Sequence, residues 1–537
     1  MQLYQVYSYA FFKGVISLSL PLGIQTIINL IQGGKVSTAW LVLVFIIMIG
    51  IAFSGILQLL QLRITETIQQ KIFTRAVFDF AYRIPRIRFE DIDPYYPPEL
   101  MNRFFEVPVL QKNISKVLID LPSAVLQILF GLIVLSFYHP FFISFSLFLL
   151  LLVIVVIVFT AKRGLETSII ESKQKFKAAS WLEELARVKD TFKLAGKTDL
   201  PLTRMNSLAT NYIEARESHF RILKLQYIIL LFFKVAISAS LLLVGGYLVL
   251  EQKMNIGQFV AAEIIILLLI DSSEKLILNF DTIYDVLTSL EKINEVTTMT
   301  LEKDEQQSTV HVNSNATGFE VELHKISFQY PGNSHLIIND SSTIIRAGER
   351  VCIAGENGSG KSTLLHLIAG LFKPTSGNIL INKFHMENYD RSELYQYFGQ
   401  GLVDEALFDG TLAENISLGR ENISPESVLW ATQVVGLDSY IKNLPEGIST
   451  KIELSGGRLP ESIYNKIIIA RSIVSRPKLL LLEIAMDSFE KEERHRLIDF
   501  LTDSSNAWTL IYICNDDYFK NKATQVLRIE SGKITQS

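Results

Sequence analysis

The residues best suited to chemistry lie in one short stretch, residues 355–363, which reads G-E-N-G-S-G-K-S-T. Glycines in such a loop allow successive backbone N–H groups to point at phosphate oxygens. Lys361 is placed to reach the β- and γ-phosphates, and the hydroxyl of Ser362 to hold Mg²⁺. The residues expected to bind the nucleotide are Gly355, Asn357, Gly358, Gly360, Lys361, Ser362 and Thr363. The stretch therefore predicts a site for a nucleotide with Mg²⁺.

Two secondary-structure elements must position this loop. Residues 351–354 read V-C-I-A, which favours a buried strand, and residues 364–368 read L-L-H-L-I, which favours the start of a helix. The N-terminus of a helix brings the positive end of its dipole to a bound phosphate. A strand before the loop and a helix after it distinguish this stretch from a chance glycine- and serine-rich loop.

The N-terminal half of the chain is predicted to cross a membrane. Hydrophobic residues make up 49% of the sequence, the mean hydropathy is +0.28, and the excess lies in this half. The apolar runs long enough to span a bilayer are residues 9–31, 39–60, 118–138, 141–161, 227–250 and 256–276. The first run has no basic region before it and no small-residue cleavage site, so we expect a membrane helix and not a cleaved signal.

Lysine and arginine residues predict the orientation of these six helices. Nine of them lie between the second and third runs, and the segment between the fourth and fifth runs is also strongly basic. The opposite loops carry only Lys35 and Lys253. Because basic loops stay on the cytoplasmic side, both termini are expected in the cytoplasm, and the protein in the cytoplasmic (inner) membrane. The charge asymmetry and the six runs argue against a soluble ATPase.

The two basic segments are amphipathic and are predicted to extend the membrane helices into the cytoplasm. Each turns back at its far end, so each could present a short helix to a cytoplasmic partner, or could be an ordinary solvated face. Within the membrane, Lys234 and Asp271 are expected at similar depth, where they could pair. They and Glu263 could line a substrate path, or they could be purely structural.

Overall charge and cysteine content exclude two further classes. The net charge of -4 does not indicate a protein that binds nucleic acid. Cys352 and Cys514 are the chain's two cysteines, and each lies in an apolar, strand-like run. A fold held together by several disulfides is therefore excluded. Both cysteines are expected to pack in the core and not to be reactive thiols.

Composition divides the chain into three parts. Residues 1–300 are expected to form a transmembrane domain with six helices and two cytoplasmic coupling segments. Residues 301–318 are polar and are expected to be a linker. From residue 319 to residue 537, short β-rich runs give way to alternating strands and helices, the pattern of an α/β P-loop domain.

This organisation and its motifs resemble the ATP-binding-cassette (ABC) exporters. The resemblance covers essentially the whole chain, as a half-transporter with six membrane helices fused to one nucleotide-binding domain. The membrane part looks most like bacterial type I secretion and bacteriocin exporters. Tyr330, in the run F-Q-Y-P-G, looks like the aromatic residue that stacks on adenine, and Gln400, in Y-F-G-Q, looks like the glutamine that touches Mg²⁺.

The resemblance implies cofactors and partners as well as a fold. ATP and Mg²⁺ are the implied cofactors, with Ser362, Gln400 and Glu483 as the implied metal-contacting residues. The implied partners are a second half-transporter, in a homodimer or a heterodimer, membrane lipid and an envelope adaptor protein. The secretion-like resemblance favours a peptide or protein as substrate.

The signature that should contact the nucleotide of the opposite subunit departs from the family pattern. Residues 454–458 read L-S-G-G-R, close to the family's L-S-G-G-Q. However, counting back from I-I-I-A-R at residues 467–471, or forward from L-P-E-G at residues 444–447, reaches residues 459–463, which read L-P-E-S-I. On the favoured reading, Pro460 replaces the phosphate-binding serine; the alternative keeps 454–458 as the signature.

The positions of the metal ligand and the catalytic groups also depart from the family. The apolar run at residues 479–482 normally ends in Asp-Glu, but here it ends in Glu483 and Ile484. Glu483 could still reach Mg²⁺ through water, whereas Ile484 has no group that could polarise the attacking water. Asn515 stands in the slot of the family's histidine. No intact catalytic residue is therefore expected at these slots.

Two functions follow from this pattern of retained and lost residues. The first is an exporter half-transporter that binds Mg-ATP and dimerises but hydrolyses ATP slowly. The second is a membrane scaffold or regulatory subunit that binds ATP without pumping and pairs with a catalytically intact half-transporter. ATP turnover measured beside nucleotide affinity separates the two, with Lys361→Ala as the control.

Overall fold

The computed structural model describes residues 2–33, 38–92, 95, 97–302, 310–312, 317–403, 405–452, 459–484, 486–514 and 516–536. The chain forms two compact units. The first comprises Met1–Ile87 and Tyr95–Thr300, and the second comprises Arg88–Pro94 and Leu301–Ser537. The short segment Arg88–Pro94 therefore lies between two membrane helices in the sequence but belongs with the C-terminal unit.

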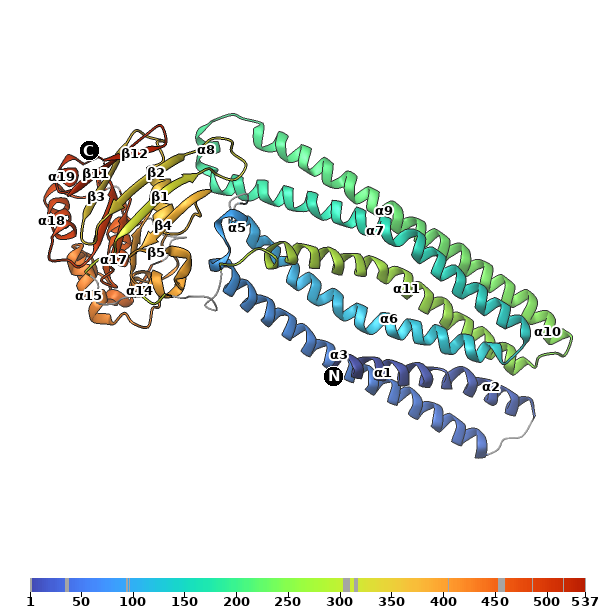
Figure 1. Ribbon diagram of the computed structural model, residues 1–537. Helices are drawn as coiled ribbons and strands as arrows, with labels where there is room; N and C mark the ends of the chain where they lie inside the picture. Colours follow the sequence, from blue (N-terminus) through green and yellow to red (C-terminus); the bar gives the residue numbers. More distant parts are fainter. Residues whose placement is uncertain are drawn as a thin grey trace. The chain divides into compact units, whose positions relative to one another are not determined.

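The first unit is built from long helices (Figure 1). They are α1 (Gln2–Ser17), α2 (Ser19–Gln32), α3 (Thr38–Arg83), α6 (Glu106–Ser136), α7 (Pro140–Arg187), α9 (Leu200–Ser240) and α11 (Ile256–Thr297), with the short helices α5 (Pro97–Met101), α8 (Lys189–Leu194) and α10 (Gly246–Leu250). Helix α6 packs along α11, and α7 packs along α9. A π-helical turn, Leu241–Gly245, joins α9 to α10.

Five helical segments in the described part of the chain are long and apolar enough to cross a membrane. They are Gln2–Gln32, Thr38–Arg86, Glu99–Ser136, Leu200–Leu250 and Ile256–Thr297. The fourth predicted span falls within the 48-residue helix α7, so the number six stays a prediction. Helix α3, with 46 residues, is about 70 Å long at 1.5 Å per residue, far more than a hydrocarbon core of about 30 Å. The membrane helices thus continue beyond their apolar runs.

Lys234 and Asp271, which could have paired at similar depth, have other partners in the structure. The ammonium of Lys234 lies 3.5 Å from a carboxylate oxygen of Glu274. Asp271 instead pairs with Lys275 at 2.7 Å, one turn further along the same helix. Residues four apart on a helix lie on the same face, so Lys275 is a nearer partner for Asp271 than Lys234 on another helix.

The C-terminal unit contains two main sheets (Figure 1). An antiparallel sheet has the order β2-β1-β4-β5, from β1 (Val321–Phe328), β2 (Ile338–Ile345), β4 (Ser376–Ile381) and β5 (Phe384–His385). A mainly parallel sheet has the order β12-β11-β3-β10-β9-β6, from β3 (Arg350–Gly355), β6 (Phe398–Gly401), β9 (Leu479–Leu482), β10 (Thr509–Ile513), β11 (Gln525–Glu530) and β12 (Lys533–Gln536). A small ribbon pairs β7 (Gly410–Thr411) with β8 (Lys451–Ile452).

Helices surround these sheets. They are α4 (Phe89–Ile92), α12 (Lys361–Ile368), α13 (Arg391–Tyr395), α14 (Leu412–Ser417), α15 (Pro425–Val434), α16 (Asp438–Lys442), α17 (Glu461–Ile473), α18 (Lys491–Thr502) and α19 (Asp517–Asn521). All four leucines of β9 are buried, because a parallel strand covered on both faces has no solvent side. In open α/β sheets, ligands bind beyond the carboxyl ends of the parallel strands. Strands β3, β9 and β10 lie next to one another, so their ends form one edge.

A partly buried carboxyl near helix α17, that of Glu405, should make the stability of this unit depend on pH. Burial raises the pKa of Glu405 from its ordinary 4.5 to about 7, although Arg471 at 3.6 Å partly opposes the shift. Between these values the folded carboxyl keeps a proton that the unfolded one has lost. The stabilisation by Glu405 is therefore complete below about pH 4.5 and is lost as the pH rises through 7.

We accordingly expect Glu405→Gln to reduce the loss of stability that accompanies rising pH. The melting temperature of the full-length protein, measured by differential scanning fluorimetry at pH 5 and at pH 8, should differ less in the variant than in the wild type. The exposed Glu421→Gln is the matched control and should leave the difference unchanged. An equal pH difference in Glu405→Gln and wild type would contradict the assignment.

Candidate functional site

The phosphate loop lies between β3 and α12, as the sequence predicts. Gly355, Gly358 and Gly360 have φ angles of 152°, 80° and 101°, which glycine adopts without strain. A Cβ atom at Gly360 would come within 2.8 Å of the side chain of Ile337, so this position also requires a residue without a side chain. The Nζ atom of Lys361 donates to the carbonyl oxygens of Gly355 at 2.9 Å and Glu356 at 2.8 Å, which holds the ammonium over the loop.

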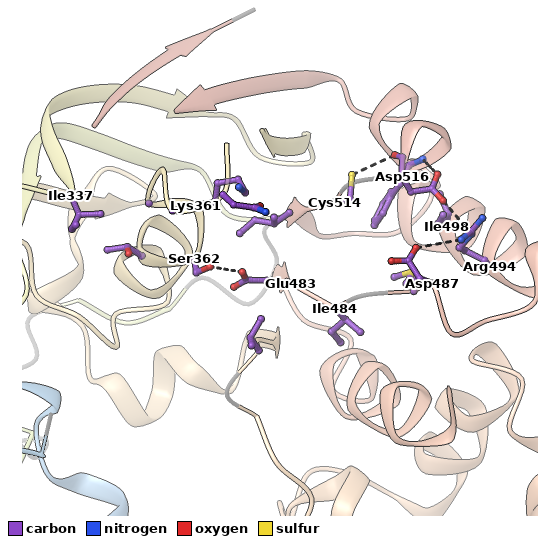
Figure 2. Close-up of a pocket in the computed structure, with 18 of the residues that line it drawn as sticks. Ile337, Lys361, Ser362, Glu483, Ile484, Asp487, Arg494, Ile498, Cys514 and Asp516 are labelled. Atoms are coloured by element: carbon purple, nitrogen blue, oxygen red, sulfur yellow. Dashed lines mark hydrogen bonds and ion pairs between the residues drawn. The ribbon is translucent and has the colours of Figure 1, made fainter. Parts of the chain in front are cut away.

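Two of the three side chains expected at the metal, those of Ser362 and Glu483, meet at the end of β9. The hydroxyl of Ser362 donates to Oε1 of Glu483 (Figure 2). The other carboxylate oxygen, Oε2, is buried and has no hydrogen-bond partner within the described part of the chain. A buried acceptor without a partner is costly, and Mg²⁺ is bound by oxygen ligands and by waters it retains. The orphaned oxygen beside a hydroxyl therefore fits a Mg²⁺ ion that accompanies nucleotide phosphates.

A cavity of about 560 Å³ opens above this corner. It is lined by most of the residues predicted from the sequence: Tyr330, Asn357, Gly358, Gly360, Lys361, Ser362, Thr363, Glu483 and Ile484. Gly355 and Gln400 are not among its described lining residues. Gln400 lies in β6 opposite Leu481 of the neighbouring strand β9. The structure thus brings the phosphate loop, Tyr330 and Glu483 around a single space.

Tyr330 lies beside the loop and not in the protein core. Its hydroxyl is 3.1 Å from Oγ1 of Thr363, and either oxygen can donate. The ring packs edge-to-face on Phe328 and Phe372, with centroids 5.2 and 5.7 Å away. Edge-to-face contacts of this kind fix the orientation of the Tyr330 ring. This position is compatible with the predicted stacking on adenine, which stays a prediction.

Ile484 occupies the position directly after Glu483 at the cavity wall. It is half-buried and packs with the apolar cluster beneath the sheet. Its Cδ1 atom lies over Gly401 of β6, so closely that a Cβ atom there would be 2.6 Å away. The side chain presents only carbon to the cavity, and Figure 2 shows it below Glu483. Ile484 thus places no titratable group at this point.

Two departures predicted from the sequence concern other segments. Asn515 and residues 454–458 lie outside the described residues. Pro460 is described, and it directly precedes helix α17, which begins at Glu461. Its backbone has φ −54° and ψ 139°, and no side-chain hydrogen bond caps the helix. Residues 459–463 therefore occupy the N-terminus of a helix, where the favoured reading places the signature.

Some cavity residues carry no motif that sequence reasoning could use. Arg494 of α18 pairs with Asp516 at 3.1 Å and with Asp487 at 3.6 Å (Figure 2). The other additions are Ile337, Val403, Met486, Ile498, Ile513, Cys514 and Phe519. Val403, Ile513 and Cys514 lie within two residues of the carboxyl end of a strand, which is a weak signal. The remaining residues have no such signal in the sequence.

Comparisons with known proteins identify the family. The ABC transporter family model matches residues 338–483, and the model of the ABC transporter transmembrane region matches residues 8–273. HlyB of Escherichia coli, named an alpha-hemolysin translocation ATP-binding protein, is 27% identical over 293 residues, 54% of this chain and 41% of HlyB. YgaD of Bacillus subtilis (strain 168), provisionally named for multidrug export, is 26% identical over 292 residues, 54% of this chain and 50% of YgaD.

The matched region spans half or less of the length of these two curated relatives. A solved structure, that of a bacterial Atm1-family ABC exporter with ATP bound, shares the fold with a TM-score of 0.83. The superposition covers 99% of this chain and 94% of the exporter's chain, at 19% sequence identity. The expected resemblance is thereby confirmed: the chain belongs to the ABC transporter family and has the organisation of an exporter half-transporter, a membrane region followed by a nucleotide-binding domain.

Proposed function

We propose that this chain binds Mg-ATP and dimerises to export a substrate across the cytoplasmic membrane, while it hydrolyses ATP slowly. One observation carries the proposal: Ser362 and Glu483 keep a corner suited to Mg²⁺, whereas the next residue, Ile484, presents only carbon to the same cavity. Binding at the chain's own phosphate loop and hydrolysis therefore depend on different side chains, and the loop is retained whereas the slot of the catalytic carboxylate holds Ile484.

The size of the loss follows from the role of the missing carboxylate. A positioned general base typically contributes about 10² to 10⁴-fold to a rate. Most phosphate contacts come instead from the loop, which Ile484 does not alter. ATP would act chiefly as the bridge between two nucleotide-binding domains. The proposed nucleotide contacts are those of the loop together with Tyr330 and Gln400, and the proposed metal contacts are Ser362, Gln400 and Glu483.

Lys361→Ala tests the binding half of this proposal. Lys361 offers a charged donor to the phosphates, and a hydrogen bond to a charged group contributes about 1.5–3 kcal/mol. We expect the affinity for Mg-ATP to fall by about 10- to 100-fold, because 1.4 kcal/mol is a factor of ten. The affinity is measured with a fluorescent ATP analogue on the full-length protein in lipid. The exposed Lys373→Ala is the matched control and should bind as the wild type does. Equal affinities in the wild type and Lys361→Ala would refute this site.

The second candidate is a regulatory subunit of a heterodimer. The same pair of observations favours it, because a chain that binds ATP but turns it over slowly could complete a site on an intact half-transporter. Co-expression with candidate partners and affinity capture in lipid distinguish the two: a homodimer that exports supports the first, and a mixed dimer whose partner supplies the turnover supports the second.

For the substrate we propose a peptide or protein, since HlyB is named for the translocation of alpha-hemolysin. An envelope adaptor protein is proposed as a further partner. Both termini are proposed to face the cytoplasm. Transport of labelled peptides into inside-out vesicles checks this choice, and accumulation of small hydrophobic compounds in place of peptides would replace it with the drug-export alternative suggested by the name of YgaD.

A further inference from the structure

The two cysteines of the chain are 162 positions apart and meet beside the candidate site. Cys352 lies in β3, and Cys514 directly follows β10. Their Sγ atoms are 3.7 Å apart, and both thiols are free. In the parallel pairing of these strands, Cys352 is opposite Tyr512. Because side chains alternate along a strand, Cys514 lies on the same face as Tyr512 and therefore as Cys352.

The two thiols differ in their access to solvent. Cys352 is fully buried among the apolar residues beneath the sheet. Cys514 is partly exposed and lines the cavity that also holds Lys361 and Ser362 (Figure 2). A reagent that enters the nucleotide cavity thus reaches one sulfur, and the second sulfur lies in contact behind it. This arrangement differs from that of two separate core cysteines, which the sequence alone suggests.

We propose that Cys352 and Cys514 are a redox modification site: a hydroperoxide that enters the nucleotide cavity oxidises them to a reversible disulfide, which competes with nucleotide binding. The formation of the bond does not depend on the proposed function. Only the competition rests on it, because the competition requires that the cavity hold a nucleotide.

The chemistry balances in two steps. In the first, the sulfur of Cys514 attacks an oxygen atom of the hydroperoxide, so that an S–O bond forms and the O–O bond breaks. Cys514 becomes a sulfenic acid, and the departing oxygen takes up the thiol proton and leaves as water or an alcohol. In the second, the sulfur of Cys352 attacks the sulfur of Cys514, an S–S bond forms, and the S–O bond breaks. The departing hydroxide takes the thiol proton of Cys352 and leaves as water. The two thiols together lose two electrons and two protons.

The positions of the two sulfurs set the order of the steps. The partly exposed sulfur of Cys514 meets the oxidant first. In the reduced pair, the hydrogen bond between the thiols lowers the pKa of Cys352 and raises the pKa of Cys514. The S–H group of Cys514 is lost in the first step, so contact carries the second step: the sulfur of Cys352 lies 3.7 Å from the sulfur that it attacks.

The disulfide would act on both sides of the nucleotide cavity. It must shorten the sulfur–sulfur distance from 3.7 Å to about 2.0 Å. Cys352 lies three residues before Gly355, where the phosphate loop begins, and Cys514 is itself part of the cavity wall. A shift of either strand end therefore changes the binding cavity. Because coupling between two binding events is reciprocal, a nucleotide that opposes the disulfide is opposed by it to the same degree.

Thiol counting on the full-length protein in lipid tests the bond itself. The reduced protein is treated with hydrogen peroxide, quenched with N-ethylmaleimide, denatured, and digested for mass spectrometry. We expect a peptide pair linked through Cys352 and Cys514, and its loss after dithiothreitol. Cys352→Ser and Cys514→Ser are matched variants, and neither should yield an internal link. The result from the wild type suffices if a variant fails to fold. Two alkylated thiols in the wild type, or over-oxidation of Cys514 without a link, would overturn the proposal.

Nucleotide coupling tests the competition separately. Saturating Mg-ATP should shift the redox equilibrium of the pair, measured in a glutathione buffer, about tenfold toward the two thiols in the wild type, within the usual range for coupled sites, and should not do so in Lys361→Ala. Correspondingly, the oxidised wild type should bind the fluorescent ATP analogue about tenfold more weakly than the reduced protein. A redox equilibrium that is the same with and without ATP, in a protein that binds ATP, would refute the competition alone. Absence of ATP binding to the reduced protein would refute the proposed function and leave the disulfide standing.

Discussion

Replacing Ile484 by glutamate is expected to raise ATP turnover by about 10²-fold or more. The side chain at this position lines the cavity directly after the residue that contacts Ser362. A carboxylate here could accept a proton from the attacking water, a function that typically contributes about 10² to 10⁴-fold. Ile484 is only half-buried, so the new charge can stay hydrated. Phosphate release by the full-length protein in lipid nanodiscs measures the gain.

Ile484→Gln is the matched control for this experiment. Glutamine has nearly the size of glutamate and can accept a hydrogen bond, but it is not basic, so no gain is expected. Should Ile484→Glu alone give a small gain, the double variant with Asn515→His restores the second family side chain. Turnover that is equal in the glutamate and glutamine variants, at unchanged ATP affinity, would show that Ile484 is not what limits hydrolysis.

Removing the guanidinium of Arg350 is expected to destabilise the nucleotide-binding unit by about 4 kcal/mol, since several buried acceptors lose a charged donor at once. Arg350 is only 3% exposed and begins strand β3. It donates to five backbone carbonyl oxygens: Gly348, Thr502 (3.3 Å), Asp503 (2.5 Å), Asn506 (3.2 Å) and Trp508 (2.8 Å). These contacts fix the connection before β10 against the start of β3. Burial also lowers the pKa of Arg350 from its ordinary value.

The consequence should appear as a lower melting temperature. For a unit of this size, about 4 kcal/mol corresponds to a shift of roughly 10 °C. The melting temperature of full-length Arg350→Ala is measured by intrinsic fluorescence, since Trp508 lies against the lost contacts. The exposed Arg346→Ala changes the same residue type nearby and should shift it little. Similar melting temperatures for the two variants would contradict the role given to Arg350.

Sequence patterns were sufficient for the parts of the site that local chemistry encodes. Residues 355–363 predicted a loop between a strand and a helix, and the structure has β3 before it and α12 after it. The run of leucines at β9 likewise predicted a buried strand that ends at Glu483. In both cases the residues of a short stretch determine its local structure. Glycines permit the positive φ angles of the loop, and an unbroken run of apolar residues requires a strand that is buried on both faces.

What the sequence could not supply was contact between distant segments. The proximity of Cys352 to Cys514 depends on β3 and β10 being neighbours in the sheet, which no local pattern reveals. The ion pairs of Arg494 join α18 to the segments that follow β9 and β10. The partners of Lys234 and Asp271 could not be predicted, because depth in a membrane does not give the rotation of a helix about its axis. Each of these depends on tertiary arrangement.

The fate of bound ATP tests the central claim most directly. The full-length protein in lipid is mixed with a sub-stoichiometric amount of radiolabelled Mg-ATP, and the bound nucleotide is separated and identified over time. The account predicts that most of the label stays ATP long after binding is complete, and that Ile484→Glu converts it to ADP about 10²-fold faster. Rapid conversion of bound ATP to ADP by the wild type, abolished in Lys361→Ala, would contradict it.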